Sequence, residues 1–146
     1  MAAKVDWSVF LPEGEGKGEV VLSCSSCHDL REIITLKKTK AGWNRSMQAM
    51  ISTYSAPVDE ADLPIIVSYL SKHFGDNNPL EQLPMNVNSA SAEALERLPR
   101  ISTEAANAIV ESRNISGPFA SVEDLLRIKG LDVATLEKIR HYIKTQ

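Results

Sequence analysis

Cys24-Ser25-Ser26-Cys27-His28 contains both cysteines of the 146-residue chain, and a histidine directly follows the second cysteine. A C-x-x-C-H run is typical of the attachment site of a c-type haem. Two thiols three residues apart on one helical turn can each form a thioether with a haem vinyl group, and the next side chain can reach the iron. We therefore predict one covalent haem c per chain, attached through Cys24 and Cys27, with His28 as the proximal iron ligand.

Other uses of a cysteine pair fit this sequence less well. A structural zinc site needs four soft ligands, and His73 and His141 lie far along the chain without ligand spacing. A thioredoxin-like C-x-x-C belongs in a βαβ unit, and no strand-like run precedes Cys24. A disulfide across two intervening residues would be strained. Haem attachment remains the preferred interpretation.

A haem iron with one histidine needs either an open site or a second axial ligand. Trp43, Met47 and Met50 fall at i, i+4 and i+7 of a predicted helix over Gly42–Met50, so the three side chains share one face. A plain core stripe explains this spacing equally well. The residues alone leave four candidates for the distal ligand: Met47, Met50, Met85 and His73.

The composition predicts an all-α protein. Hydrophobic residues make up 43% of the chain and aromatic residues 5%, strand-like alternation is nearly absent, and no apolar run approaches the length of a membrane span. The net charge of −3 indicates no strongly charged partner, and the two halves have similar charge balances. Covalent haem c is assembled outside the bacterial cytoplasmic membrane, so we expect a periplasmic or otherwise exported protein whose signal peptide has been removed ahead of Ala2-Ala3.

The first half is expected to hold short helices around the haem. A helix carries the cysteines from about Glu13, a basic polar loop covers Arg31–Lys40, and another helix starts near Asp62 and ends with Gly75 as its C-cap. Glycine disfavours helix, so we attribute Gly16 to a close approach by a partner helix. A domain this small has little core of its own, so haem burial should supply missing apolar contacts.

These motifs resemble the small monohaem cytochrome c domains of sulfite and alcohol dehydrogenase systems. The resemblance covers residues 11–75 and rests on Pro12-Glu13-Gly14-Glu15-Gly16-Lys17, Cys24-Ser25-Ser26-Cys27-His28-Asp29-Leu30, Trp43, Met50, Tyr54-Ser55-Ala56-Pro57, Tyr69-Leu70 and Phe74-Gly75. It implies a cytochrome c-like fold with Met50 as the distal iron ligand and with Trp43 and Tyr69 at the cofactor. Ser55 stands where that family has glycine, which puts the local turn in question.

The second half contains two related helical hairpins. Two segments, ALERLPRISTEAANAIV and DLLRIKGLDVATLEKIR, form a short internal repeat, and Ser121-Val122-Glu123-Asp124 has the form of a capping box. We expect helices up to Leu98, over Thr103–Arg113 with Ala106, Ile109 and Val110 inward, from Ser121 to Ile128, and after Asp132 with Leu136, Ile139 and Ile143 inward. The predicted domains are residues 1–75, a linker over 76–85, and residues 86–146.

The second half resembles the paired helix-hairpin-helix domain of ComEA-type competence DNA receptors over residues 86–144. The matching residues include Val87-Asn88, Ala90-Ser91-Ala92, Leu95, Leu98-Pro99, Ala105, Ile109, Gly117-Pro118-Phe119, Ser121-Val122-Glu123-Asp124-Leu125 and Ile128-Lys129-Gly130. The resemblance implies DNA binding by backbone N–H groups that face phosphates. Candidate DNA contacts are Arg100, Lys129, Gly130 and Lys138.

The hairpin glycines argue against strong DNA binding. Such hairpins are usually G-(I/V)-G, because a bare backbone approaches a phosphate closely and adopts positive φ. Arg100 and Ser102 occupy the two glycine positions of the first hairpin, and Asp132 occupies one of the two in the second, beside Gly130. A carboxylate thus stands where a phosphate should lie.

We therefore expect an electron carrier rather than an enzyme, with a helix-hairpin-helix domain that docks the cytochrome onto redox partner proteins. Arg31, Lys37, Lys38 and Lys40 are candidates for a docking patch or for a solvated loop. Two alternatives remain: a DNA-binding or DNA-uptake protein that carries a haem, and a haem-based sensor or enzyme with a displaceable distal ligand.

Overall fold

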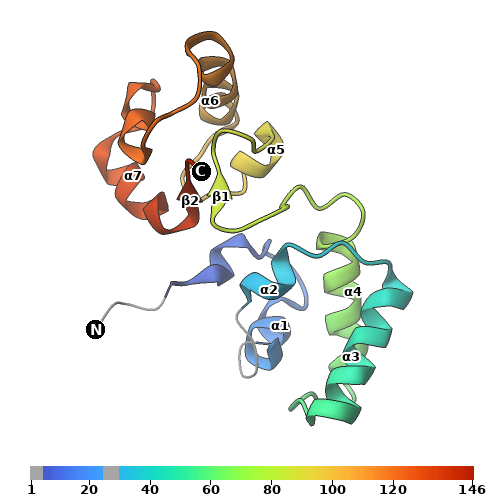
Figure 1. Ribbon diagram of the computed structural model, residues 1–146. Helices are drawn as coiled ribbons and strands as arrows, with labels where there is room; N and C mark the ends of the chain where they lie inside the picture. Colours follow the sequence, from blue (N-terminus) through green and yellow to red (C-terminus); the bar gives the residue numbers. More distant parts are fainter. Residues whose placement is uncertain (1–4, 25–29) are drawn as a thin grey trace. The chain divides into compact units, whose positions relative to one another are not determined.

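A computed structural model describes residues 5–24 and 30–146 of the chain (Figure 1). Two compact units divide between Asn78 and Pro79. Both are helical, and the only strands among the described residues are two residues long and pair in parallel. The all-α class is confirmed.

The described residues of the first unit, Asp6–Asn78, contain five helical elements. They are η1 (Trp7–Phe10), α1 (Lys17–Cys24), α2 (Arg31–Ile34), α3 (Lys40–Tyr54) and α4 (Leu63–His73). Helix α4 packs against both α1 and α3, so it forms the centre of this unit. Its buried face carries Ile66, Val67, Tyr69 and Leu70.

Helix α3 begins earlier and ends later than the sequence pattern predicts. The Thr39 hydroxyl accepts a hydrogen bond from the Gly42 N–H at 3.1 Å, which starts the helix at Lys40. Ser55 ends it in the left-handed conformation with φ of 54°. The loop predicted over Arg31–Lys40 is wrong in part, because Arg31–Ile34 forms α2 and buries Ile33 and Ile34.

Two glycines lie where side chains would collide. A Cβ on Gly16 would lie 2.8 Å from Tyr69 Cβ and 3.1 Å from the Ile65 carbonyl oxygen, so the predicted close approach to a partner helix is confirmed. Gly16 itself precedes α1 and has φ of 101°. Gly75 follows the helix end, where Phe74 is the C-cap, and a Cβ there would lie 2.7 Å from the Ser71 carbonyl oxygen.

The second unit runs from Pro79 to Gln146. Its elements are β1 (Met85–Asn86), α5 (Ala92–Leu95), α6 (Thr103–Ser116), η2 (Val122–Arg127), α7 (Val133–Ile139), η3 (Arg140–Tyr142) and β2 (Ile143–Lys144). Met85 pairs with Ile143 and Asn86 with Lys144. The short ladder therefore joins the beginning of this unit to its end (Figure 1).

Several predicted helix limits in this unit are wrong. Helix α5 ends at Leu95 rather than Leu98, and α6 continues past Arg113 to Ser116. The final predicted helix is shorter, since Ile143 is buried in β2 rather than on a helix. The capping box at Ser121 is confirmed, although it begins the 3-10 helix η2. In that box the Asp124 carboxylate accepts a hydrogen bond from the Ser121 N–H at 3.2 Å.

Two asparagine side chains hold loops in place by hydrogen bonds to backbone groups of distant segments. Asn78 is buried and donates through Nδ2 to the carbonyl oxygens of Ile34 and Leu36, both at 2.9 Å. Asn88 donates to the carbonyl oxygens of Phe119 and Thr145, both at 3.0 Å, and accepts from the Phe119 N–H. The two side chains thus fix the end of the first unit and the closure of the second.

Across residues 5–24 and 30–146, no helix combines the length and apolar character needed to cross a membrane.

Candidate nucleic-acid interface and haem pocket

The second unit contains the same hairpin twice, at a spacing of 30 residues. We name Leu98–Ser102 hairpin 1, which lies between α5 and α6, and Ile128–Asp132 hairpin 2, which lies between η2 and α7. Buried residues recur at matched positions of the two copies: Leu95 and Leu125, Leu98 and Ile128, Ile101 and Leu131, Ala105 and Thr135, Ala106 and Leu136, Ile109 and Ile139. The internal repeat in the sequence is therefore a repeat of packing.

Each hairpin turns through a type II β-turn. The Ile101 N–H donates to the Leu98 carbonyl at 3.4 Å, and the Leu131 N–H donates to the Ile128 carbonyl at 3.1 Å. The third residue of each turn has positive φ, 63° at Arg100 and 96° at Gly130. Positive φ at this position alone defines type II, which favours glycine there. Arg100 thus adopts the glycine conformation at a steric cost that Gly130 avoids.

The second glycine position of the pattern needs no glycine conformation in this chain. Ser102 and Asp132 have φ of −77° and −106° and are the N-caps of α6 and α7. The Ser102 hydroxyl accepts from the Ala105 N–H at 3.1 Å, and the Asp132 carboxylate accepts from the Thr135 N–H at 2.8 Å. The missing glycines therefore leave the backbone of the hairpins intact, and what changes is the charge at the helix start.

The Asp132 carboxylate stays ionised at a lower pH than an ordinary aspartate, because its pKa is lowered. Hydrogen bonding from Thr135 lowers the pKa of Asp132, and the positive charge of Arg100 lowers it further. Arg100 belongs to hairpin 1 and Asp132 to hairpin 2, and the effect of Arg100 on the pKa of Asp132 is the last of its causes. A carboxylate stabilised in this way stays negative at neutral pH.

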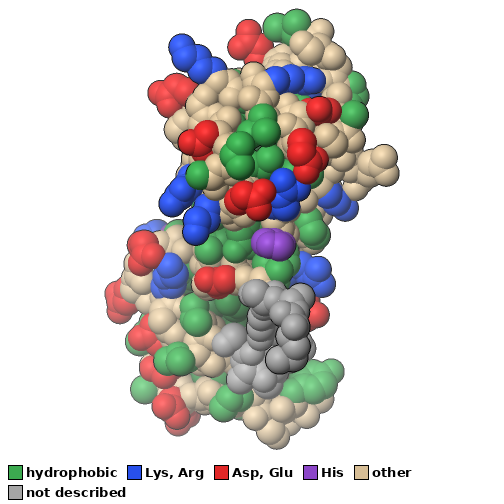
Figure 2. All heavy atoms as spheres, turned by 90° about the vertical axis from the view of Figure 1, so that its left-hand side faces the viewer, with side chains coloured by type: hydrophobic (Ala, Val, Ile, Leu, Met, Phe, Trp, Pro, Cys, Tyr) green, Lys and Arg blue, Asp and Glu red, His purple; other side chains and the backbone are tan. Residues whose placement is uncertain are grey.

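The four residues predicted to contact DNA are exposed, as that role requires. Arg100, Lys129 and Gly130 are exposed on the two hairpins, and Lys138 is exposed on α7, six residues beyond the N-cap Asp132. The face shown in Figure 2 has basic and acidic side chains interspersed, with no broad basic patch. The chain as a whole has a net charge of −3, so we expect any nucleic-acid affinity to rest on a few local contacts.

The predicted haem residues lie partly in an apolar pocket of the first unit. Its lining contains Ser23, Cys24, Ile33, Met47, Met50, Tyr54, Ala56 and Val58. Cys24 and Met47 are buried, and Met50 is half-buried. One predicted thioether cysteine and two candidate distal methionines therefore line one small apolar pocket of about 20 Å³.

Among the described residues, Trp43 and Tyr69 do not line that pocket. Cys27 and His28 lie outside the described residues. Trp43 is buried and donates its indole N–H to the Phe74 carbonyl at 3.0 Å, while the Tyr69 hydroxyl donates to the Pro12 carbonyl. Both side chains hold the helices of this unit together, and neither lines the pocket.

Two alternative distal ligands lie elsewhere. The His73 ring contacts the Tyr69 ring with centroids 4.5 Å apart. Met85 belongs to the second unit, where its side chain lines a different pocket. Neither is in the group that surrounds Cys24.

Two of the four residues of the predicted docking patch, Arg31 and Lys38, contact other side chains of the first unit. The Arg31 guanidinium lies 5.6 Å from the Trp7 ring centroid. Lys38 donates to the Ser46 hydroxyl at 2.6 Å and lies 5.5 Å from the Trp43 ring centroid. Lys37 and Lys40 are exposed.

Sequence reasoning did not anticipate the positive φ of Arg100, because arginine is seldom found there. The Leu-Pro-Arg-Ile order was the available signal, since proline favours the second position of a type II turn and Gly130 occupies the equivalent third position 30 residues later.

Comparison with known proteins supports the assignment of the second half. The family described as "Helix-hairpin-helix motif" matches residues 81–144, so a helix-hairpin-helix domain is present. Human and mouse "Endonuclease/exonuclease/phosphatase family domain-containing protein 1" are each 41% identical over 59 residues, which is 40% of this chain and 10% of each relative. An "Uncharacterized protein" of Haemophilus influenzae is 40% identical over 60 residues, 40% of this chain and 54% of that protein. The chain thus spans about a tenth of the length of the vertebrate relatives.

Proposed function

We propose that the helix-hairpin-helix domain binds the sugar–phosphate backbone of duplex nucleic acid, chiefly through hairpin 1. The observation that carries the proposal is the type II turn kept by both hairpins, with positive φ at Arg100 and Gly130. Such turns direct backbone N–H groups outward, where they can meet an anion. The match of residues 81–144 to the helix-hairpin-helix family also supports it.

The vertebrate relatives add limited support. Their printed name includes an endonuclease/exonuclease/phosphatase domain, but the shared segment covers only 10% of each of them. We therefore take from them no catalytic activity. What they support is the use of such a segment within proteins named for nuclease-type domains.

Hairpin 1 is better suited to a phosphate than hairpin 2. From Leu98 to Glu104 the charged residues are Arg100 and Glu104, and the N-cap Ser102 is neutral. Hairpin 2 carries Lys129 as its cation, but its N-cap is the Asp132 carboxylate. A like charge at about 4 Å costs about 1 kcal/mol even in bulk water. The phosphate contact of hairpin 2 is therefore the weaker one.

We therefore favour nucleic-acid binding over docking onto redox partner proteins as the role of this domain. The missing glycines do not exclude a phosphate-binding backbone, because Arg100 keeps the glycine conformation and the second position needs none. The Asp132 carboxylate still disfavours a phosphate at hairpin 2. We expect weak binding with a shallow salt dependence, since only two or three phosphates are contacted.

The test is fluorescence anisotropy of the full chain with a labelled duplex of about 20 base pairs at several KCl concentrations. We expect Arg100→Gln to weaken binding about fivefold to tenfold, since it removes one charge-assisted phosphate contact. Lys72→Gln, at an exposed position of α4 in the first unit, is the matched control and should leave the affinity unchanged. No binding at low salt, or equal losses in both variants, would contradict the proposal.

A second function is favoured by the pocket shared by Cys24, Met47 and Met50. We propose that the first unit carries haem c through Cys24 and Cys27 and transfers single electrons to redox partners. When bound, the haem supplies an iron that is oxidised and reduced by one electron. Cys24 would hold the group to α1, the apolar side chains around it would exclude water, and a thioether of Met47 or Met50 on α3 would favour the reduced iron. Export from the cytoplasm and the absence of a catalytic role are parts of this proposal.

The haem proposal is tested on protein produced in a host that exports it and assembles haem c. We expect a c-type absorption spectrum and a mass increase of one haem, both lost in Cys24→Ser. Loss of the methionine–iron charge-transfer band in Met50→Ala, with the band kept in Met47→Ala, would assign the distal ligand to Met50. Protein that emerges without covalent haem would contradict the proposal. Ready binding of cyanide or CO by the unaltered chain would favour a sensor or enzyme over a carrier.

A further inference from the structure

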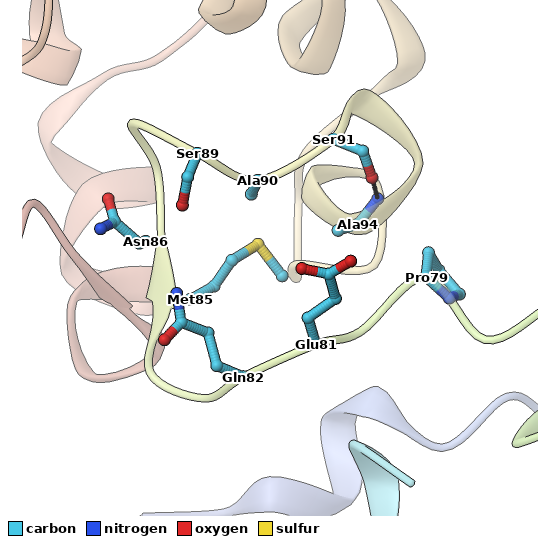
Figure 3. A pocket seen from close by; sticks show the side chains of 9 residues that line it. All are labelled: Pro79, Glu81, Gln82, Met85, Asn86, Ser89, Ala90, Ser91 and Ala94. Carbon is cyan, nitrogen blue, oxygen red and sulfur yellow. Dashed lines mark hydrogen bonds between the residues drawn. The ribbon is translucent and has the colours of Figure 1, made fainter. Parts of the chain in front are cut away.

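A cavity of about 130 Å³ lies in the second unit, beside β1 and α5 (Figure 3). The side chains that line it come from the segment before β1, from β1 itself and from the turn into α5. They are Pro79, Glu81, Gln82, Met85, Asn86, Ser89, Ala90, Ser91 and Ala94. None of them belongs to a hairpin or to the haem pocket, so the cavity is independent of both proposed functions.

Part of the inner surface of the cavity is apolar and adaptable, and Gln82, Asn86, Ser89 and Ser91 line the rest. The Met85 side chain extends into the middle of the group drawn in Figure 3, and this residue is only 2% exposed. Ala90 and Ala94 contribute methyl groups beside it. A methionine thioether is unbranched and polarizable, so it adjusts its shape to an alkyl chain.

One charge faces this apolar surface. The Glu81 carboxylate points into the cavity above the Met85 thioether (Figure 3), and Glu81 is the only ionisable residue in the lining. Within the described part of the chain, Glu81 receives neither a hydrogen bond nor an ion pair. The Asn86 Oδ1 and Ser91 Oγ acceptors already receive the N–H groups of Asn88 and Ala94. Among the lining acceptors that remain, the Glu81 carboxylate is the one that carries a charge.

We propose that this cavity binds a primary alkylammonium group. The ammonium pairs with Glu81 at the mouth, and the alkyl chain lies along Met85 and Ala94. Drug-sized ligands occupy about 300–1,000 Å³, so this cavity suits one unbranched amine. A lysine side chain has that form, a compact charge on a flexible four-carbon stem, whereas guanidinium is a wider planar group.

The binding test is an NMR titration of the full chain with n-butylammonium, with n-butanol as the neutral probe of the same chain length. We expect saturable shifts of the Met85 methyl signal and the Ala90 and Ala94 signals with the amine only. Equal shifts with both probes, or no saturation with the amine, would overturn the proposal.

The charge test compares two carboxylates of the same unit. Glu81→Gln keeps the shape of the side chain and should weaken amine binding about tenfold, since it removes a charge-assisted contact. Glu93→Gln makes the same charge change at an exposed position of α5 outside the lining and should leave binding unchanged. Equal effects of the two variants would show a general charge effect and overturn the assignment to Glu81.

Two further probes distinguish the sources of such a group. N-acetyl-lysine methylamide represents a lysine of a partner protein, and putrescine represents a free diamine. Tighter binding of the lysine derivative would identify a protein side chain as the occupant, and tighter binding of putrescine would identify a free amine. Failure of both would overturn the proposal.

Discussion

Hairpin 1 and hairpin 2 have the same backbone and different charges. Both turn through a type II turn and lead into a capped helix, with Leu98 to Ser102 matching Ile128 to Asp132. Hairpin 1 places arginine at the strained position and a neutral hydroxyl at the N-cap. Hairpin 2 places glycine and a carboxylate at the same positions. The difference teaches that the fold of this motif depends on its turn and its buried side chains, while phosphate binding depends on side chains that the fold leaves free to vary.

The first and largest effect concerns the shared core. Ile109 and Ile139 occupy matched positions and are 0% and 1% exposed. We expect Ile109→Ala and Ile139→Ala each to lower the free energy of unfolding by about 2–4 kcal/mol, because each leaves a cavity in a packed core. Urea denaturation measures both losses.

Val133→Ala is the control for that pair, since Val133 is 62% exposed and should change the free energy of unfolding by less than about 0.5 kcal/mol. A large loss in one isoleucine variant and none in the other would show that the two copies do not share one core.

The second effect concerns the turns and has opposite signs in the two hairpins. We expect Gly130→Ala to destabilise the domain by about 1 kcal/mol, because alanine at positive φ is strained. The space around a Cβ at Gly130 is open, so the cost is one of backbone conformation. Arg100→Gly should stabilise the domain by a smaller amount, because it relieves the same strain. Thermal or urea denaturation measures both.

Arg100→Gly also separates stability from binding. It should stabilise the domain and weaken nucleic-acid binding, since the guanidinium is lost. A variant that gains in both, or loses in both, would contradict the division of roles between turn and side chain.

The sequence predicted the kinds of element in this domain well and their limits poorly. The 30-residue spacing of buried side chains, the Ser121 capping box and the turn at Gly117-Pro118 are local signals, so they are visible in the residues themselves. The end of α5 at Leu95 and the placement of Ile143 in β2 were missed. The placement of Ile143 depends on pairing between segments more than 50 residues apart, which no local pattern reports. Nothing in the structure explains why α5 ends at Leu95.

The candidate sites, too, could be predicted only in part from local sequence patterns. Spacing along α3 placed Met47 and Met50 on one face, and both line the pocket with Cys24. The same spacing grouped Trp43 with them, yet its indole binds the Phe74 carbonyl instead. Which residue of a shared helix face reaches a site depends on the neighbouring helix, so the sequence narrows the candidates without choosing among them. The Glu81 cavity had no sequence signal, because it brings together a loop, a strand and a helix start.

The third effect concerns the charge at the N-cap. Asparagine caps a helix about as well as aspartate, so Asp132→Asn should leave stability nearly unchanged. We expect it to raise the affinity for duplex nucleic acid about threefold to fivefold, since one like charge near the phosphate is removed. Ser102→Asp should lower the affinity of hairpin 1 by a similar factor. Fluorescence anisotropy titration of both variants with duplex nucleic acid measures the two changes in affinity.

Glu111→Gln is the matched control, with the same charge change at an exposed position of α6 remote from the N-cap Ser102. If it raises affinity as much as Asp132→Asn, the effect is one of net charge and the comparison of the two N-caps fails.

The smallest effect is a difference in acid stability between the two caps. Hydrogen bonding from Thr135 lowers the folded pKa of Asp132 below its ordinary value, so the unfolded chain binds more protons in this pH range. The contribution of Asp132 is therefore fully present above the unfolded pKa of about 3.9 and is lost as pH falls through the folded pKa. Ser102 does not titrate, so hairpin 1 adds no such dependence.

Urea denaturation from pH 7 to pH 3 should show parallel curves for the unaltered chain and Asp132→Asn above about pH 5, with the unaltered chain losing stability faster below about pH 4. The difference will be small because the carboxylate is exposed to solvent. Curves that stay parallel down to pH 3 would mean that the Thr135 N–H does not favour the ionised form. The carboxylate would then be a less permanent obstacle to phosphate at hairpin 2 than its hydrogen bonds indicate.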